Sequence, residues 1–352
     1  EIYQHPQAVR ASLEGRVVEK ALRDVVDSTL DLSSVTRVQC LACGTSYYAC
    51  MVAKYLIEEH CGVPVDVDLA SEFRYRPATL SANTLSVAVS QSGETIDTLF
   101  ALKYAKEQGS MTLALVNAEG SSIEHEADAT FPLKAGVEVG VASTKAFSAQ
   151  MSALLLVGLQ IAKAQGKSAP EVRDELLHNM LRLPQTIETI LEQLDGAMSD
   201  IADELKDTPG YLFMGRGAEW PVAQEGALKL RELAYVFAEA YAGGELKHGS
   251  IALVDKDSWI VAVAPRDKHF EKMMSNIAEI KARGGNVLAI GTEGDSELES
   301  ISDHFVGVPN VSEPLIPFLT CIPLHLFAYW VARHKGNDVD QPRNLAKSVT
   351  VE

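Results

Sequence analysis

The sequence predicts an α/β protein built from two tandem, doubly wound subdomains, each a parallel sheet flanked by helices, followed by an ordered C-terminal tail. Strand-like and helix-like segments alternate along the chain, which is typical of parallel sheets. The order of these segments in the first half recurs in the second, and 352 residues exceed what one ordinary core requires. We therefore predict a first subdomain at 1–190, a second at 191–337 and a tail at 338–352.

The first half contains four strand-like and two helix-like segments. Short apolar runs that end at glycine or polar residues predict strands, and longer runs with apolar residues every three to four positions predict helices. The predicted elements in chain order are a strand at 37–44, a helix at 46–62, strands at 65–70 and 85–93, a helix at 95–109 and a strand at 112–117.

The second half repeats this order of elements. It contains a predicted strand at 210–217, a helix at 219–236, a strand at 258–265, a helix at 269–285 and a strand at 286–291. Gly44 and Ser90 lie 46 positions apart, and Gly215 and Pro265 lie 50 apart, so the turns also match in spacing. We interpret the halves as an internal duplication joined by a polar, helical connector at 163–194.

Composition limits the function classes. A net charge of −17 argues against a nucleic-acid partner, because such proteins carry a basic surplus. An apolar run at 315–332 is long enough to span a membrane, but prolines, a threonine and a histidine interrupt it. We therefore predict no membrane partner and a buried helix with proline near its start.

Five cysteines, an odd number, suit reduced thiols and a cytoplasmic location. Cys40 and Cys43 form a C-x-x-C pair, which in other contexts binds zinc or carries out redox chemistry. No second pair and no nearby histidine pair accompanies it. Small core and turn residues are the preferred interpretation, and neither a metal nor a cofactor is predicted.

The sequence SQSGET (residues 90–95) joins a predicted strand to a predicted helix. A glycine-containing turn of this kind presents free backbone N–H groups and the positive end of the helix dipole, which together bind anions. Ser90, Gln91, Ser92 and Thr95 add neutral donors suited to a phosphate monoester. The alternative is an ordinary serine or threonine helix cap, but four donors in six residues favour phosphate.

A second turn of the same kind is CGTS (residues 43–46), which contains Thr45 and Ser46. Neighbouring parallel strands end at one edge of a sheet, so both turns can share one ligand. The matching turns in the second half read MGRGAE and APRDKH. The first of these is an incomplete dinucleotide pattern, because Trp220 stands where the third glycine belongs, and it gives weak support for a nucleotide cofactor.

The helix at 219–236 places Glu225, Lys229 and Glu232 on one face, at i, i+4 and i+7. Such a set is usually a solvated ladder of ion pairs. Apolar residues surround this one, and a glycine-rich loop with Lys247 and His248 follows it. We therefore treat the set as a candidate acid–base group, with His248 as a second candidate.

The C-terminal sequence DVDQPRNLAKSVTVE is unusual, because chain ends are normally polar and frayed. Pro342, Leu345, Ala346 and Val349 are expected to fix it against the protein by apolar contacts. Lys347 would then be a partly buried amine able to form an imine with a carbonyl compound.

The motifs CGTS, SQSGET, GVASTKAF, EGALKLRE, GELKHG and DQPRNLAKSVTVE together resemble the sugar-isomerase (SIS) family. Within it they are similar to the isomerase half of the glutamine–fructose-6-phosphate aminotransferases, or glucosamine-6-phosphate synthases. The resemblance spans essentially the whole chain. Single motifs occur across the SIS family, whereas the tail and the lysine–histidine loop together look specific to the synthases.

The resemblance implies a role for individual residues. Fructose 6-phosphate would be bound through its phosphate by Ser90, Gln91, Ser92 and Thr95, with Thr45 and Ser46 nearby, and through its sugar by Val141 and Ser143. Glu232 would move a proton between C1 and C2, and Lys347 would form an imine with the ketose. Lys229 would hold a hydroxyl or moderate Glu232, and His248 would assist ring opening from the neighbouring subunit of a homodimer.

These roles fit the chemistry, because an imine at C2 acidifies the C1 protons that a nearby carboxylate can accept. The product would be glucosamine 6-phosphate for UDP-GlcNAc biosynthesis. The glutaminase half of the family is missing from this sequence, and the chain opens on Glu1 rather than methionine, so we expect a glutaminase domain upstream. Two alternatives remain: a stand-alone glucosamine-6-phosphate deaminase of the same fold, and a non-catalytic SIS module that senses a phosphosugar.

Overall fold

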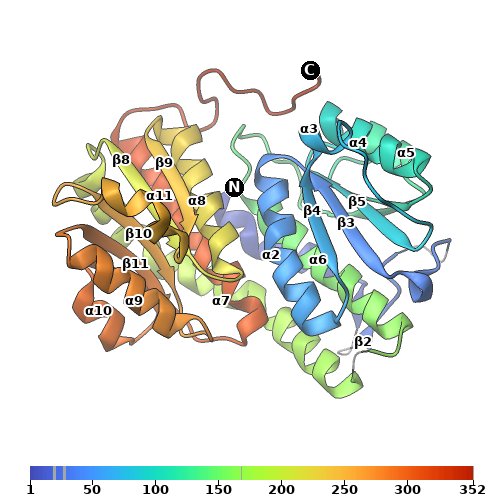
Figure 1. Cartoon of the computed structure of the whole chain (residues 1–352), viewed down its shortest axis with the longest axis horizontal. Coiled ribbons are helices and arrows are strands. Elements are labelled where there is room, and N and C mark those ends of the chain that lie inside the picture. Colours follow the sequence, from blue (N-terminus) through green and yellow to red (C-terminus); the bar gives the residue numbers. More distant parts are fainter. Residues whose placement is uncertain (19–20, 27–28, 168, 352) are drawn as a thin grey trace.

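The computed structural model describes residues 1–18, 21–26, 29–167 and 169–351. Two five-stranded parallel sheets lie side by side, each with helices on its faces, and the tail crosses the junction between them (Figure 1). The predicted fold class is confirmed.

Both sheets have the same strand order. The first follows the order β4-β3-β5-β6-β7 and the second follows β9-β8-β10-β11-β12, and every pairing within them is parallel. The strands of the first sheet are β3 (Arg37–Ala42), β4 (Val65–Leu69), β5 (Thr84–Ser90), β6 (Met111–Val116) and β7 (Ala129–Pro132). Those of the second are β8 (Gly210–Gly215), β9 (Phe237–Ala242), β10 (Trp259–Ala264), β11 (Asn286–Thr292) and β12 (His304–Val308). The predicted duplication is confirmed at the level of topology.

All predicted strands are present, and the structure adds three strands to the two sheets that the sequence did not reveal. These three, β7, β9 and β12, are edge strands. An edge strand is covered less completely than a central one, so its hydrophobic pattern is weaker. A short antiparallel pair, β1 (Val17–Val18) and β2 (Ala21–Leu22), lies outside both sheets.

The predicted helices are also present, and several more surround them. The helices are α1 (His5–Leu13), α2 (Gly44–Cys61), α3 (Ala70–Phe73), α4 (Ile96–Glu107), α5 (Ser122–Glu126), α6 (Lys145–Ala164), α7 (Pro170–Leu205), α8 (Glu219–Ala234), α9 (Phe270–Lys281), α10 (Ser296–Ile301) and α11 (Ile316–His334). Short 3₁₀ helices are η1 (Ile2–Gln4), η2 (Leu32–Ser34), η3 (Glu245–His248), η4 (Ser250–Leu253) and η5 (Glu313–Leu315).

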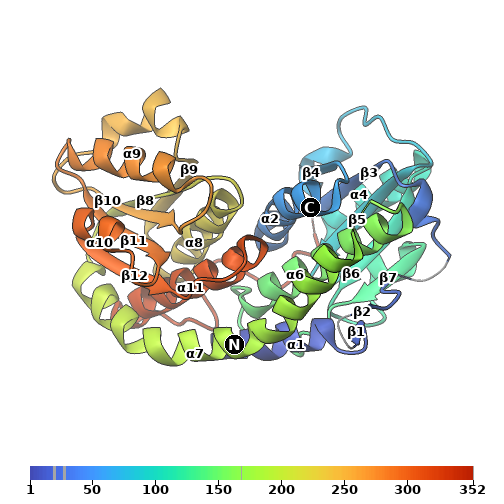
Figure 2. The same ribbon diagram turned by 90° about the horizontal axis from the view of Figure 1, so that it is seen from below.

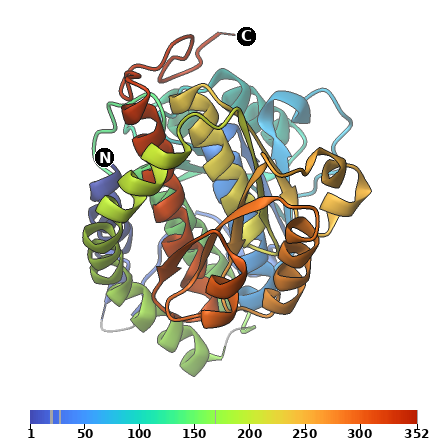
Figure 3. The ribbon, with the colours of Figure 1, turned by 90° about the vertical axis from the view of Figure 1, so that its left-hand side faces the viewer.

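The two halves share a hydrophobic core. Helix α2 of the first half packs against α8 of the second, and α11 packs against α8 and α7 (Figures 1 and 3). One continuous cluster of buried side chains includes residues of β3, β5 and α6 together with residues of β8, α8 and α11. Side chains at the junction are therefore buried as deeply as those inside either half.

The predicted connector is largely α7, which runs along one side of both halves (Figure 2). Its first helical residue is Pro170, a favourable position because proline has no N–H group to leave unbonded. The proposed subdomain boundary at 190–191 lies within this helix. Ser168 of the predicted connector and Glu352 of the predicted tail lie outside the described residues.

Two helices, Lys145–Ala164 and Glu313–His334, are long and apolar enough to span a membrane by composition alone. Both are almost wholly buried inside the protein. The run at 315–332 is thus the predicted buried helix, with Pro317 in its first turn. All five cysteines are free thiols, and all but Cys43 are buried, which agrees with their prediction as core and turn residues.

Candidate active site

The SQSGET turn connects β5 to α4 at the carboxyl edge of the first sheet. Gly93 adopts a φ of +68°, in the left-handed region that favours glycine, and an added Cβ would lie 2.1 Å from the Ser121 hydroxyl oxygen. The turn also fixes its serines, because Ser90 accepts a hydrogen bond from the Gly93 N–H and Ser92 from the Glu94 N–H. Only glycine fits this position.

The hydrogen bonds of Thr95 distinguish an anion site from a simple helix cap. It occupies the N-cap position of α4, yet its side chain makes no capping hydrogen bond within the described chain. Instead its hydroxyl lies 3.2 Å from that of Ser90. The Thr95 hydroxyl therefore lies beside that of Ser90 rather than capping α4, an arrangement that favours an anion site.

The CGTS turn lies beside the SQSGET turn, since β3 and β5 are parallel neighbours and the Cys43 sulfur lies 4.0 Å from the Thr98 hydroxyl of α4. Thr45 and Ser46 are almost buried in the first turn of α2. Ser46 accepts a hydrogen bond from Gln150 on α6. Thr45 instead faces the second half, where it contacts α8.

Lys229 on α8 lies at the centre of a buried cluster of charges. Its ammonium donates to Thr45 at 2.8 Å and to Glu232 at 2.6 Å, and it lies 3.5 Å from a carboxylate oxygen of Glu225. The side chains of Lys229 and Glu225 are completely buried, whereas that of Glu232 is 22% exposed. The set on α8 is therefore not a solvated ladder of ion pairs, because α2 and α11 cover it.

Burial and charge act against each other in this cluster. Burial by itself would lower the pKa of Lys229, but the carboxylates of Glu225 and Glu232 outweigh it and raise the pKa. Burial raises the pKa of Glu225, and the charge of Lys229 and the Thr45 hydroxyl counteract it only in part. Lys229 is therefore held in the ammonium form, and it forms ion pairs with both Glu225 and Glu232.

Lys347 reaches a second cluster from the tail. Its ammonium donates to Glu138 at 2.7 Å and to the Gly140 carbonyl at 2.9 Å. Burial would raise the pKa of Glu138, but Lys347 and the donors Thr144 N–H and Ser143 O–H hold it below its ordinary value. The negative charge of Glu138 also acts to raise the pKa of Lys229 and of Glu225, so the two clusters lie within electrostatic reach of each other.

Glu138 is a site residue that the sequence analysis missed. It lies on the loop between β7 and α6 and is 4% exposed. Ser143 donates to it at 2.8 Å, and Val141, on the same loop, donates its N–H to the Asp340 carbonyl of the tail. The signal in the sequence was a single acidic residue in the otherwise uncharged segment GVEVGVAS, which no spacing rule selects.

The tail is ordered as predicted, but the expected apolar contacts are mostly wrong. Pro342 is buried, whereas Leu345, Ala346 and Val349 are exposed. Polar and backbone contacts hold the tail instead: the Ser348 hydroxyl donates to Ser92, and the Val349 carbonyl accepts from the Ile96 N–H. The tail thus covers the SQSGET turn and carries Lys347 to the site.

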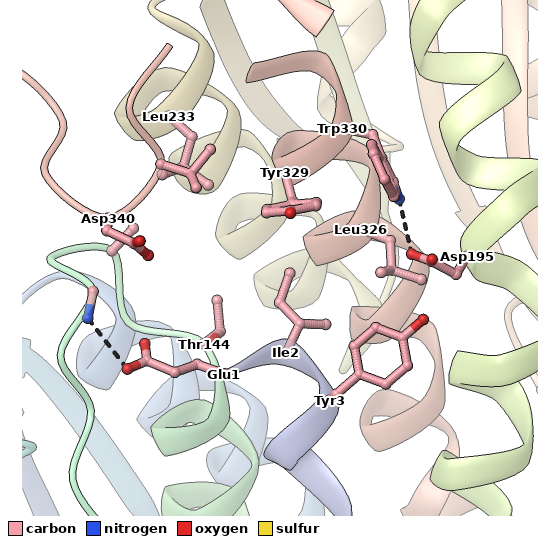
Figure 4. Close-up of a pocket in the computed structure, with 13 residues that line it drawn as sticks. Glu1, Ile2, Tyr3, Thr144, Asp195, Leu233, Leu326, Tyr329, Trp330 and Asp340 are labelled. Atoms are coloured by element: carbon pink, nitrogen blue, oxygen red, sulfur yellow. Dashed lines mark hydrogen bonds between the residues drawn. The ribbon is translucent and has the colours of Figure 1, made fainter. Parts of the chain in front are cut away.

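A cavity of about 360 Å³ lies behind the loop at 138–144 (Figure 4). Thr144, Asp195, Leu233, Tyr329 and Trp330 are among its lining residues. Trp330 donates to Asp195 at 2.9 Å, whereas the Thr144 hydroxyl has no hydrogen-bond partner among the described residues. Glu232, Lys229 and the SQSGET hydroxyls do not line this cavity. Gly140 and Thr144, which bond Lys347 and Glu138, do line it, so the cavity adjoins the Lys347 cluster.

His248 lies apart from both clusters in this chain. It is exposed at the end of η3, which follows β9, and Lys247 beside it pairs with Glu279 on α9. Within the described residues, no hydrogen bond or ion pair joins His248 to either cluster. Nor do the described residues contain a group of three or more His, Cys, Asp or Glu side chains arranged to hold a metal.

The SQSGET turn and the two clusters supply a turn rich in hydroxyls, a carboxylate beside a fixed ammonium, and a lysine amine. An anion-binding turn suits a phosphorylated substrate, a carboxylate can accept a proton from carbon, and an amine can form an imine with a carbonyl. Together these groups suit a proton transfer next to the carbonyl of a sugar phosphate.

Known proteins agree with this chemistry. The SIS domain family matches residues 31–159 and 204–335, which correspond to the two sheets. Over the whole chain, the sequence is 44% identical to the glutamine–fructose-6-phosphate aminotransferase of Escherichia coli K12 and 43% identical to that of Caldanaerobacter subterraneus. The chain spans 58% of the length of each of these curated relatives.

Solved structures show the same relationship. The C-terminal domain of glucosamine-fructose-6-phosphate aminotransferase from Francisella tularensis is 38% identical, with a TM-score of 0.92 over 97% of this chain and 96% of that one. Glucosamine-6-phosphate deaminase from Thermotoga maritima is 23% identical with a TM-score of 0.75 over 99% and 98% of the two chains, a likeness of fold alone. The chain therefore belongs to the SIS family and, within it, to the isomerase half of the glutamine–fructose-6-phosphate aminotransferases.

Proposed function

We propose that the chain binds fructose 6-phosphate and converts it to glucosamine 6-phosphate, with ammonia supplied by a glutaminase domain. The carrying observation is the pairing of Glu232 with the buried Lys229, which also bonds Thr45 of the CGTS turn. That turn lies beside the SQSGET turn, which the tail that carries Lys347 contacts. The relatives are named for glutamine and for fructose 6-phosphate, and this chain spans 58% of their length. A glutaminase domain in the remaining length would complete the reaction in amino-sugar biosynthesis.

The phosphate would lie over the SQSGET turn, within reach of Ser90, Gln91, Ser92 and Thr95. Support for this placement comes from the amino terminus of α4, which no side chain of the described residues caps, and from the Ser90 and Thr95 hydroxyls above it. The Val349 carbonyl of the tail accepts from the Ile96 N–H at this terminus. Val141 and Ser143, on the loop that also carries Glu138, would line the sugar. Thr45 would act mainly through its hydrogen bond to Lys229, and Ser46 would support the turn at the start of α2.

Lys347 would form an imine at C2 with loss of water, and ammonia would then displace the lysine amine from C2. Glu232 would accept the C1 proton of the resulting ketimine and return it at C2. In the structure the Lys347 ammonium is paired with Glu138, so it must lose a proton before it attacks the ketose. Lys229 would bind a sugar oxygen while it fixes Glu232. The partial exposure of Glu232 supports contact with a ligand.

We further propose a cytoplasmic homodimer in which His248 assists ring opening in the partner's site. The exposed position of His248, away from both clusters of its own chain, supports a role across subunits. Glycines flank the loop that carries it, which gives that loop the freedom to adapt to a partner.

The chain alone is expected to interconvert fructose 6-phosphate and glucose 6-phosphate slowly, and to make no glucosamine 6-phosphate from glutamine. The phosphate turn and the proposed base lie in this chain, whereas the ammonia is proposed to come from a glutaminase domain. A coupled assay for glucose 6-phosphate, with a parallel assay for amino sugar, measures both. Amino-sugar formation from glutamine by this chain would contradict the division of labour proposed here.

Ser92→Ala and Thr95→Ala are each expected to weaken binding of fructose 6-phosphate by about 1 to 3 kcal/mol, because a charged phosphate loses a donor. Isothermal titration with fructose 6-phosphate measures the loss, and free fructose should bind weakly to all variants. Thr292→Ala is the matched control, since this threonine ends a strand of the second sheet and accepts a hydrogen bond from the Arg266 N–H. Normal binding by both site variants would identify the turn as structural.

A further inference from the structure

A line of buried polar groups leads away from the Lys229 cluster through the core. The Glu225 carboxylate lies 3.2 Å from His325 on α11, and His325 lies 3.2 Å from His5 on α1. The other ring nitrogen of His5 lies 2.7 Å from the Ser148 hydroxyl on α6. Side chains of four helices thus form one chain of contacts, and every one of them is at most 1% exposed.

The four groups fit one direction of hydrogen bonding. A carboxylate can only accept, so His325 must donate from Nε2, and its Nδ1 must then accept from Nε2 of His5. His5 Nδ1 in turn accepts from the Ser148 hydroxyl. This assignment makes both imidazoles neutral Nε2–H tautomers, and each donor in the series points along the chain toward Glu225.

Burial supports neutral histidines. It lowers the pKa of His325 to about 3, with the charge of Lys229 acting in the same direction, and it lowers the pKa of His5 well below its ordinary value. A charged His325 would compete with Lys229 for Glu225. A neutral His325 donates a hydrogen bond and leaves the carboxylate to Lys229.

Glu225 is unusual among these groups because only one of its oxygens is used. Oε1 meets Thr45, His325 and Lys229, whereas Oε2 is buried and has no hydrogen-bond partner among the described residues. A buried oxygen left unbonded is destabilising. Packing alone does not explain why residue 225 is a glutamate rather than a glutamine of the same shape. The negative charge of Glu225 does explain it.

We propose that Glu225, held as an anion by the His325–His5–Ser148 relay, is a positioning residue that keeps Glu232 basic by sharing the Lys229 ammonium. This inference rests on the proposed role of Glu232 as the base. When Glu232 accepts the sugar proton its negative charge disappears, and Glu225 remains as the counter-charge of Lys229. Without Glu225, the same step would leave a buried ammonium unpaired, which is strongly unfavourable.

Other charged and titratable groups also face Glu225 and Lys229, and they stay in place in every variant below. They are Glu138 on the loop before α6, Tyr48 on α2 and Cys321 on α11.

Glu225→Gln is the direct test. The amide keeps the shape but removes the charge, so the Lys229 ammonium is committed to Glu232 alone. We expect the turnover number for C1 proton exchange to fall about tenfold or more, with little change in KM. We also expect the acidic limb of the pH–rate profile to move about one unit toward lower pH, because Glu232 becomes harder to protonate.

Variants of the relay separate charge from structure. His325→Leu removes the hydrogen-bond donor to Glu225. It should move the acidic limb of the pH–rate profile toward lower pH, by less than Glu225→Gln does. His325→Gln should restore the wild-type profile, because an amide N–H of similar reach can replace the imidazole. Glu219→Gln is the matched control: this carboxyl is buried on the same helix and bonds Thr320, and burial raises its pKa to about 8, so the substitution removes no charge at neutral pH.

Ionisation of the substrate phosphate is common to all variants and cancels in the comparison. A loss of turnover in Glu225→Gln with an unmoved acidic limb would reduce Glu225 to a structural role and overturn the proposal. An equal shift of the acidic limb in Glu219→Gln would also overturn the proposal.

Nitrogen-15 NMR of His5 and His325 tests the relay without any activity. Both should remain neutral Nε2–H tautomers from pH 5 to pH 9, and Glu225→Gln should shift the His325 Nε2 signal. Titration of His325 in this range, or a proton on its Nδ1, would overturn the relay. Absence of sugar exchange in the wild type together with the expected NMR result would refute the proposed function while leaving the relay intact.

Discussion

Replacement of Glu232 by glutamine is expected to abolish most isomerase turnover, by about a hundredfold to ten-thousandfold, while ligand affinity is kept. The amide has the size of the carboxylate and can still accept a hydrogen bond from Lys229, but it cannot take the C1 proton. The measurement is exchange of solvent deuterium into C1 of the sugar. Binding of fructose 6-phosphate, measured separately, should change little.

Glu239→Gln is the matched control for this experiment. Glu239 lies on β9, is paired with Arg231 near the end of α8, and is 45% exposed. Its replacement should leave exchange unchanged. Unchanged exchange in Glu232→Gln would instead assign the base to another carboxylate, with Glu225 or Glu245 as the residues to test next.

The fold was predictable because its signals are local. Central strands such as β5 and β10 are buried almost throughout, since helices cover both faces of a parallel sheet, and β10 is a continuous apolar run. The repeated order of elements then implied two similar sheets. Edge strands such as β9 were missed because Phe237 and Glu239 face outward and weaken the pattern.

The candidate site was predictable where one short segment carries the chemistry. The SQSGET turn and the face of α8 are each contained in a few residues. Glu138, His5 and His325 were missed because their contacts form only when distant parts of the sequence meet: Glu138 meets the tail, and the two histidines meet between helices. His325 looked like an interruption in an apolar run, whereas the structure gives it two hydrogen-bonding neighbours.

The tail was predicted to be ordered for the wrong reason. Its leucine and valine suggested apolar anchoring, but the tail turns and bends, with Asn344 at a φ of +64°, and it leaves these two side chains outside. In the structure Lys347 and Ser348 face the site, and Leu345 and Val349 are exposed.

Replacement of Lys229 by methionine is expected to destabilise the protein by about 3 to 5 kcal/mol, the usual effect of removing one partner from a buried ion pair. Methionine fills a similar volume, so the effect reports the loss of charge. Glu225 would be left buried without a cation, and Thr45 would lose its donor. Chemical unfolding in guanidinium chloride measures the change in the free energy of unfolding.

Two companion variants test the reason for this loss. The double variant Lys229→Met with Glu225→Gln removes both buried charges and should recover a large part of the lost stability. Lys247→Met removes a lysine that is 54% exposed and paired with Glu279, and it should cost less than about 1 kcal/mol. If Lys229→Met is no more harmful than Lys247→Met, the buried ammonium does not balance the carboxylates, and the electrostatic account of the α8 cluster is wrong.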